Sequence, residues 1–308
     1  MGRLPSWAKK SLGRPAEIHG MKALLRKRGL HTVCESARCP NIGECFSKPT
    51  ATFMILGDVC TRNCGFCSVE RSKAPMAVDP GEPGNIALTT KELGLRHVVI
   101  TSVTRDDLAD GGAAQFALTI KAIKDTISDI SVEVLVPDFR GEREALETVL
   151  GARPDIFNHN LETVPSLYPE VRPQAGYRRS LDHLAAAKAS GVMTKSGIMV
   201  GLGETPGQVK EVLSDLCGAG CDAVTIGQYL RPTKKNLEVR EYVRPEVFRE
   251  YEEYGRSIGI RHVYSGPFVR SSYNAERLAG GTFLYKGSPG PPPKTFVLVL
   301  RGGIFKSE

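Results

Sequence analysis

The sequence predicts an α/β fold in which about six strand–helix units form a partial TIM-like barrel that stays open on one side. Apolar runs of strand length recur along the chain, and stretches of helical character lie between most of them. This alternation is typical of βαβ units and of a parallel sheet. With 308 residues, 41% of them hydrophobic, the chain is long enough for one large domain or two smaller ones.

Seven apolar runs are predicted to be strands: Thr52–Leu56, His97–Thr101, Val132–Val136, Asp155–Phe157, Thr194–Val200, Ala223–Ile226 and His262–Tyr264. Five stretches are predicted to be helices: Ala114–Ile127, Glu142–Leu150, Ser180–Ala189, Pro206–Cys217 and Pro245–Ile258. The fourth helix has the clearest boundaries, because Thr205 can cap it, Pro206 suits its first turn and Gly218 suits its exit. Chemistry in parallel barrels lies at the carboxyl ends of the strands, so the residues after each run are the candidates.

The two ends of the chain are predicted to differ from the middle. Residues 1–51 contain helical pieces and many of the cysteines, and we expect them to form an N-terminal extension. Residues 52–277 would form the barrel. Residues 278–308 include the Pro/Gly segment GSPGPPPK, which cannot fold compactly, and are predicted to form a poorly ordered tail.

The net charge of +7 favours acidic partners. We find no nucleic-acid-binding module, so an acidic protein or an anionic cofactor is the better prediction, while a solvated basic surface without a specific partner stays open. The sequence contains no run of 18 apolar residues, and its basic start lacks the apolar stretch of a secretory signal. We therefore expect no membrane span and a reducing compartment.

Eight cysteines carry most of the functional information. Six of them lie between positions 34 and 67, and clustered cysteines in a reducing compartment usually bind metal. The other two, Cys217 and Cys221, stand four apart at a predicted helix exit, where free cysteine behaves as a small buried hydrophobe.

The segment CTRNCGFC places Cys60, Cys64 and Cys67 directly after the first predicted strand. Three thiolates on one short loop suit a [4Fe–4S] cube and leave its fourth iron free for another ligand. A zinc site would need a fourth cysteine or a histidine, and this loop has no histidine. The spacing, with Phe66 before the third cysteine, resembles the radical S-adenosylmethionine (SAM) superfamily. The resemblance implies that SAM binds the open iron and is cleaved to a 5′-deoxyadenosyl radical.

A second cysteine group narrows the resemblance. CESARCPNIGEC places Cys34, Cys39 and Cys45 upstream of the first strand, and VRSSYNAE places Ser271 and Ser272 near the far end. Together these motifs resemble the lipoyl synthase family, and the likeness covers roughly residues 5–277. The family holds an auxiliary [4Fe–4S] cluster with three cysteines and a serine, which implies Ser272 here, with Ser271 as the near alternative.

The resemblance also implies an activity and its partners. Family members are sulfurtransferases that insert two sulfur atoms, taken from the auxiliary cluster, at C6 and C8 of an octanoyl-lysine. The octanoyl group is carried by a lipoyl domain, from a 2-oxoacid dehydrogenase E2 subunit or a glycine cleavage H protein. An electron donor such as ferredoxin or flavodoxin and iron–sulfur carrier proteins would assist. The expected location is the bacterial cytosol, or a plastid or mitochondrial matrix if the protein is organellar.

Polar residues after the predicted strands are candidate SAM contacts. Asn158, His159 and Asn160 follow a short strand, and we name Asn158 together with Glu162 as cofactor-binding candidates. Arg178 begins a helix and could pair with the SAM carboxylate. The segment SGIMVGLGE, Ser196–Glu204, looks like the superfamily element that packs near the adenine. Each of these groups also has a purely structural interpretation, as a hydrogen-bonded network or as turn chemistry.

Other functions remain as alternatives. Biotin synthases and methylthiotransferases also insert sulfur, but they lack the combination of the first cysteine group with RSSY. A two-cluster electron carrier would not need so many βα repeats. A zinc-stabilised binding module would bind zinc and leave SAM intact.

Overall fold

The main sheet is an open arc of eight strands. The computed structural model describes residues 5–10, 13–47, 52–273 and 275–279. The strand order is β1-β2-β5-β6-β7-β8-β9-β10, with only the β1–β2 pair antiparallel. The strands are β1 (His31–Thr32), β2 (Thr52–Ile55), β5 (His97–Ser102), β6 (Ser131–Leu135), β7 (Ile156–Asn158), β8 (Met193–Val200), β9 (Ala223–Gln228) and β10 (His262–Gly266).

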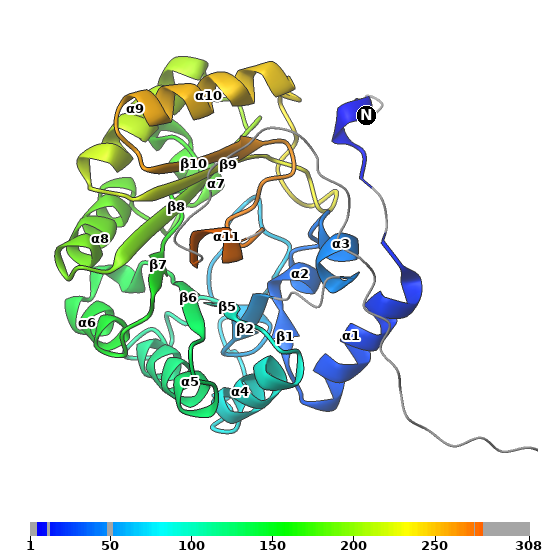
Figure 1. Ribbon diagram of the computed structural model, residues 1–308. Helices are drawn as coiled ribbons and strands as arrows, with labels where there is room; N and C mark the ends of the chain where they lie inside the picture. The colour runs from blue at the N-terminus through cyan, green and yellow to red at the C-terminus, as the bar shows by residue number, and fades with distance from the viewer. Residues whose placement is uncertain (1–4, 11–12, 48–51, 274, 280–308) are drawn as a thin grey trace, which may run out of the picture.

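Helices surround the outer face of this arc, and the N-terminal helices α1 to α3 lie beside its open side (Figure 1). The outer helices are α4 (Glu82–Glu92), α5 (Ala113–Thr126), α6 (Arg143–Gly151), α8 (Tyr177–Ala189), α9 (Pro206–Gly218) and α10 (Pro245–Ser257). The N-terminal helices are α1 (Pro15–Lys27), α2 (Val33–Ser36) and α3 (Ile42–Ser47). The molecule is therefore a partial parallel barrel, as predicted, with β10 as a seventh parallel strand after six strand–helix units.

All seven predicted strands and all five predicted helices are present, with bounds within three residues of those expected. The cap of α9 is also confirmed, because the Thr205 hydroxyl accepts from the Gln208 amide and the Gln208 side chain accepts from the Thr205 amide. The exit differs slightly: Gly218 ends the helix, and the positive φ of +76° falls on Gly220.

Several elements were not predicted, among them helix α4 and strand β1. Helix α4 contains Pro83, Gly84 and paired threonines, which weaken a helical pattern in sequence. In the structure, the Thr89 and Thr90 hydroxyls donate to the Asn85 and Ile86 carbonyls at 2.7 and 2.8 Å, so both fit inside the helix. Strand β1 is too short to show alternation. It links the N-terminal extension to the sheet, pairing His31 with Met54.

The apolar core lies between the sheet and the outer helices in two main clusters. The N-terminal half packs Phe53 and Ile100 of the strands against Phe116 and Ile120 of α5. The C-terminal half packs the strands against α9 and α10, and it includes Cys217 and Cys221. Every residue of β2 and of β9 is buried, as expected for parallel strands covered on both faces.

A buried ion pair crosses the inner face of the barrel. The Lys195 ammonium lies 2.9 Å from one Glu133 carboxylate oxygen, and both side chains are almost fully buried. The Asn158 side chain donates to the same carboxylate at 2.9 Å, and His97 lies 3.6 Å from it. Burial acts to raise the pKa of Glu133, but Lys195, His97 and Asn158 outweigh it and hold the pKa below its usual value.

The end of the described chain returns into the barrel. Helix α11 (Glu276–Ala279) lies inside the arc of strands (Figure 1). Leu278 packs against Ile156 and Ala223, which stand at the beginnings of β7 and β9, so this segment covers the amino-end side of the barrel interior. The tail predicted from residue 278 lies outside the described residues from 280 onward, and the predicted domain boundaries stay a prediction.

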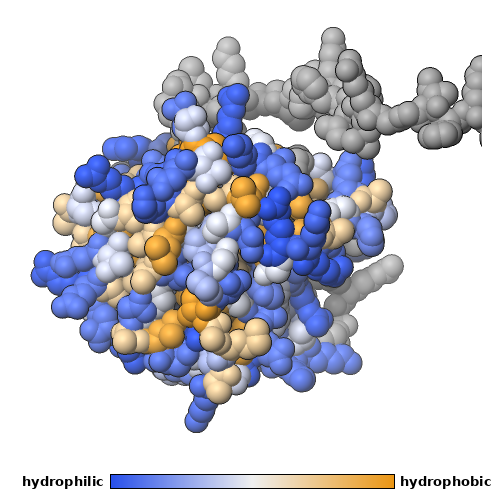
Figure 2. Space-filling model, turned by 90° about the horizontal axis from the view of Figure 1, so that it is seen from below, coloured by the Kyte–Doolittle hydropathy of each residue, from blue (hydrophilic) through white to orange (hydrophobic). Residues whose placement is uncertain are grey.

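Figure 2 views the molecule from below relative to Figure 1, the side on which α4 and α5 lie. On this face, apolar side chains lie among hydrophilic ones. Leu88 and Leu118 of these helices are about half exposed, at 51% and 54%. Single exposed apolar side chains are normal on a folded protein. In the described part of the chain, no helix has both the length and the hydropathy needed to cross a membrane.

We predict that Lys195→Met destabilises the protein by about 3–5 kcal/mol at neutral pH, because it leaves the Glu133 carboxylate buried without its cation. Urea unfolding monitored by circular dichroism measures the loss. The double variant Glu133→Leu/Lys195→Met is the control, and it should recover most of the stability. Equal losses in the single and double variants would contradict the explanation.

Candidate functional site

The first cysteine group forms a loop at the carboxyl end of β2. Cys60 ends β3 (Val59–Cys60), which pairs in parallel with β4 (Glu70–Arg71) and closes the base of the loop. The backbone N–H groups of Arg62 and Thr104 each donate to the Cys60 sulfur at 3.4 Å. Hydrogen bonds of this kind to cysteine sulfur are typical of iron–sulfur sites.

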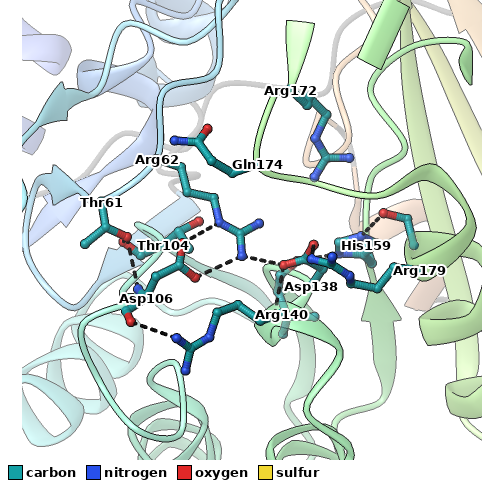
Figure 3. A network of polar contacts seen from close by, with 12 residues as sticks. Thr61, Arg62, Thr104, Asp106, Asp138, Arg140, His159, Arg172, Gln174 and Arg179 are labelled. Carbon is teal, nitrogen blue, oxygen red and sulfur yellow. Dashed lines mark hydrogen bonds and ion pairs between the residues drawn. The ribbon is translucent and has the colours of Figure 1, made fainter. Parts of the chain in front are cut away.

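Arg62, inside this loop, is buried and joins two strand ends. Its guanidinium contacts both Asp106 carboxylate oxygens at 2.7 and 2.9 Å and lies 2.6 Å from Asp138 (Figure 3). Arg179 contacts the other Asp138 oxygen at 3.1 Å, and Arg140 donates to the Asp106 carbonyl at 3.2 Å. Burial acts to raise the pKa of Asp138, but Arg62 holds it well below its usual value. The loop is therefore clamped to the segments after β5 and β6.

The segment after β9 holds the opposite side of the loop. The Asn236 side chain donates to the Cys67 carbonyl at 2.8 Å, and the Leu237 amide donates to the Gly65 carbonyl at 3.1 Å. A Cβ at Gly65 would lie 2.8 Å from the Leu237 side chain, so glycine is needed for this close approach. The cysteine loop is thus fixed from both sides.

The second cysteine group lies in the N-terminal extension. Cys34 is in α2, whose first turn is capped by Thr32, and Cys45 is in α3, while Cys39 lies between these helices. The Ser68 hydroxyl, next to Cys67, donates to the Ser36 carbonyl at 2.7 Å. This bond places the two cysteine groups side by side.

The RSSY segment lies beside the second cysteine group, although more than 220 residues separate them. The Asn41 side chain donates to the Phe268 carbonyl, 227 residues away in sequence, at 2.8 Å. The Tyr273 hydroxyl donates to the Glu44 carboxylate, 229 residues away, at 3.0 Å. Lys10 lies 2.9 Å from the same carboxylate. Asn41 and Glu44 both lie between Cys39 and Cys45, so the two motifs named from sequence are neighbours.

The two serines of RSSY have different surroundings. The Ser271 hydroxyl donates to the Asn160 side-chain oxygen at 2.9 Å. A Cβ at Gly197 would lie 2.7 Å from the Ser271 oxygen, and one at Gly227 would lie 2.2 Å from the Val269 carbonyl oxygen, so both glycines admit this segment. The Ser272 hydroxyl, in contrast, makes no hydrogen bond to any described residue.

Three charged side chains lie between the cysteine groups. Glu162 is half-buried, has a positive φ of +67° and accepts from the Asn160 side chain at 3.1 Å. Burial raises the pKa of Glu162, against the opposing charges of Arg172 and Arg270. Burial lowers the pKa of Arg270, while Cys39 and Glu162 act to raise it. Arg270 is thus the cation within electrostatic reach of both Glu162 and the second cysteine group.

Of the predicted cofactor-binding residues, the structure places Glu162 near the first cysteine loop, where its charge affects the pKa of Cys64 and of Cys67. The structure does not bring Asn158 or Arg178 there. Asn158 is held by Glu133, and Arg178 is exposed on α8, paired with Asp182 at 3.0 Å. The arginine whose charge most strongly lowers the pKa of Cys64 is Arg172, which sequence reasoning missed.

Arg172 is 9% exposed and donates to the Asn160 and Leu161 carbonyls at 2.7 and 3.1 Å. Its buried Nε has no hydrogen-bond partner among the described residues. His159, the remaining polar residue of this stretch, is held by Val136 and Ser180 at 2.8 and 2.9 Å. The Asn160 and Arg172 side chains therefore face the site, while His159 supports the barrel.

The donor set fits iron–sulfur clusters. All eight cysteines are free, and burial raises the pKa of Cys34 and of Cys67 to about 12, so a bound cation is needed to keep these thiolates ionised. Among the described residues, no three His, Cys, Asp or Glu side chains are arranged around a single metal ion. In a cube each thiolate binds a different iron, so its sulfur ligands stand further apart than those of zinc.

Comparison with known proteins identifies the family. Residues 54–216 match the model of the Radical SAM superfamily. A lipoyl synthase of Caldanaerobacter subterraneus subsp. tengcongensis is 55% identical over 276 residues, which cover 89% of this chain and 96% of the relative. One from Caldicellulosiruptor saccharolyticus is 56% identical, covering 88% and 96%. The chain belongs to the lipoyl synthase family. Membership in the superfamily implies a [4Fe–4S] cluster and SAM as cofactors.

Solved structures support the fold. SuiB of Streptococcus suis bound to S-adenosylmethionine aligns with a TM-score of 0.54 at 12% identity over 73% of this chain. The maturase HydG from Carboxydothermus hydrogenoformans aligns with a TM-score of 0.53 at 15% identity, also over 73%. The alignments cover 53% and 64% of those longer chains. At these identities the likeness concerns the barrel alone.

We predict that Arg62→Lys slows SAM cleavage about 10- to 100-fold, because lysine keeps the charge but cannot bridge Asp106 and Asp138 together. The rate of 5′-deoxyadenosine release, measured per bound cluster after iron quantitation, checks this. Arg140→Lys is the matched control, since among the described residues the Arg140 side chain donates only to the Asp106 carbonyl, and it should stay close to wild type. A normal rate for Arg62→Lys would show that the clamp does not position the loop.

Proposed function

We propose that this protein is a sulfurtransferase that inserts two sulfur atoms at C6 and C8 of a protein-bound octanoyl-lysine, forming the lipoyl group. The observation that carries the proposal is the meeting of three motifs at one site. The Cys60–Cys64–Cys67 loop, the Cys34–Cys39–Cys45 group and the RSSY segment are joined by the hydrogen bonds of Ser68, Asn41 and Tyr273. Two cluster sites that adjoin each other suit the transfer of sulfur to a radical.

Cys60, Cys64 and Cys67 are proposed to hold the first cluster and leave one iron for SAM. When bound, this cluster supplies the electron that cleaves SAM to methionine and a 5′-deoxyadenosyl radical. We assign the SAM contacts to Glu162 and to Arg172, whose unpartnered Nε suits an anionic group such as the SAM carboxylate. Asn158 and Arg178, the other predicted contacts, are held by Glu133 and Asp182 and are not part of this assignment.

Cys34, Cys39 and Cys45 are proposed to hold the second cluster, which is a substrate because its sulfur is consumed. Ser272 is the proposed fourth ligand. Its hydroxyl makes no hydrogen bond within the described residues, whereas that of Ser271 is engaged by Asn160. A serine oxygen is a poor ligand for soft iron, so it suits a cluster that must come apart.

The side chains between the two sites position the reaction. Asn160 bonds Ser271 on one side and Glu162 on the other, so it holds the RSSY segment at a fixed place relative to the proposed SAM contact. Arg270, half-buried and within electrostatic reach of Glu162 and Cys39, supplies positive charge between two sites that both carry anionic ligands.

The substrate is proposed to be a lipoyl carrier protein, an E2 subunit of a 2-oxoacid dehydrogenase or a glycine cleavage H protein. Two SAM molecules are consumed for each lipoyl group. A ferredoxin or flavodoxin would donate electrons, and iron–sulfur carrier proteins would rebuild the second cluster. Free cysteines throughout the chain favour a reducing location, such as the bacterial cytosol or an organellar matrix.

The function is tested by anaerobic reconstitution followed by addition of SAM, reductant and an octanoyl-lysine peptide. We expect about eight irons per chain, in line with two [4Fe–4S] clusters, and both sulfurs inserted into the peptide. Cys34→Ala should retain SAM cleavage and lose sulfur insertion, whereas Cys64→Ala should lose both. Cleaved SAM with an unmodified peptide would require another substrate, and bound zinc with intact SAM would exclude the proposal.

The serine assignment is tested by a matched pair. Ser272→Cys should bind the fourth iron more tightly and reduce sulfur insertion about tenfold or more, while SAM cleavage continues. Ser271→Cys, one position away, should cause a smaller loss. Mass spectrometry of the peptide and assay of 5′-deoxyadenosine separate the two effects. The opposite ranking of the two variants would transfer the role to Ser271.

A further inference from the structure

A basic groove opens beside the two cysteine groups. It is a cavity of about 590 Å³ between the cysteine loop and the segment after β9. Its lining residues are Arg38, Cys67, Ser68, Val69, Glu70, Arg71, Thr233, Lys234, Lys235 and Asn236. Four of them, Arg38, Arg71, Lys234 and Lys235, are exposed cations, and Glu70 is the only acid among the lining residues.

The cations of this basic groove lack acidic partners, unlike many others on the surface. Arg28, Lys121, Arg143, Arg178 and Arg256 each lie within 3.0 Å of a carboxylate. In contrast, no ion pair with a described residue involves the four groove cations. Within the described part of the chain, the Arg71 side chain donates only to Asn63 and to the Cys64 and Cys67 carbonyls. Four positive charges without an ion pair to a described residue therefore face the same hollow.

The walls of the basic groove are fixed by hydrogen bonds. The Gln228 side chain donates to the Glu241 carbonyl at 3.0 Å and accepts from the Val243 amide at 2.9 Å. The Tyr229 hydroxyl donates to the Leu237 carbonyl at 2.8 Å. Within the lining itself, the Lys235 amide donates to the Thr233 hydroxyl at 3.2 Å and the Asn236 side chain donates to the Cys67 carbonyl at 2.8 Å. The Arg231 side chain donates to the Lys234 carbonyl, so the backbone of both lysines is held in place.

The basic groove adjoins both proposed cluster sites. Cys67 lies in its wall, and Arg38 directly precedes Cys39. The Ser68–Ser36 hydrogen bond joins the segment that follows Cys67 to the segment that precedes Arg38. A protein whose acyl-lysine reaches between the clusters would therefore rest against this rim, and a positive rim selects an acidic face.

We propose that the basic groove docks an acidic surface of the carrier protein beside the octanoylated lysine. This inference rests on the proposed function. The groove attracts the folded carrier through charge, while the acyl chain alone enters between the clusters. The four cations that dock the carrier are not among the proposed cluster ligands or SAM contacts. Loss of groove charge therefore weakens carrier recognition and leaves the reaction of a bound acyl chain unchanged.

The test compares Lys234→Gln/Lys235→Gln with wild-type protein loaded with both clusters. With an octanoylated carrier domain, we expect KM and the directly measured Kd to rise about three- to tenfold with unchanged kcat. With a short octanoyl-lysine peptide that lacks acidic residues, we expect wild-type kinetics. Raising the ionic strength should weaken carrier binding to wild type more than to the variant.

Lys121→Gln/Arg178→Gln is the matched control, because it removes the same charge from paired positions on the outer helices. It should leave the carrier Kd unchanged. An unchanged carrier Kd in the groove variant, an equal loss with the peptide, or tighter binding of a short RNA duplex than of the carrier would overturn the proposal. If wild type modifies neither substrate but carrier binding still depends on Lys234 and Lys235, the proposed reaction fails and the docking surface stands.

Discussion

The ion pairs of Arg62 with Asp106 and Asp138 are the interaction on which the site depends. A cysteine loop is by itself a flexible turn, and its three sulfurs must hold a fixed spacing. Arg62 places a planar cation between two carboxylates from different strand ends, and Arg179 compensates the second carboxylate oxygen of Asp138. Charges buried this deeply are tolerated only when each is paired, so the arrangement has few alternatives. The loop thereby acquires the rigidity of the sheet.

The second constraint is the return of the chain into an open barrel. The sheet does not close between β10 and β1, and this leaves room for the N-terminal extension on one side and the RSSY segment inside. Gly197 and Gly227 lack the Cβ atoms that would collide with that segment. Glycine at these two positions is therefore needed to admit the RSSY segment, apart from any role near a cofactor. The barrel is open and the two cysteine groups lie side by side for the same reason, namely that β1 and β10 stand at opposite ends of the sheet.

Much of this architecture could be predicted from sequence because it is local. Apolar runs predict strands such as β9 (Ala223–Gln228), and cap residues predict helices such as α9 (Pro206–Gly218). Cysteine spacing predicts cluster ligands for the same reason. The Arg62–Asp138 pair joins distant segments and leaves no local pattern. Arg178 and Arg172 show the same limit, because both are arginines between β7 and β8. Arg172, directly after α7 (Tyr168–Val171), donates to the Asn160 and Leu161 carbonyls, whereas Arg178 is exposed on α8 and pairs with Asp182.

Burial explains why the site is built as a rigid frame. The pKa of Cys34 and of Cys67 is raised to about 12, so without bound iron these side chains are neutral thiols. Cluster binding must then release protons, and its free energy is reduced by the cost of ionising buried sulfur. A flexible loop would add the cost of ordering the backbone. Because Arg62, Asn236 and Asn41 fix the backbone beforehand, more of the binding energy remains to stabilise the clusters. On the proposed assignment, this rigid frame would let a second cluster with a weak fourth ligand keep its place beside the first.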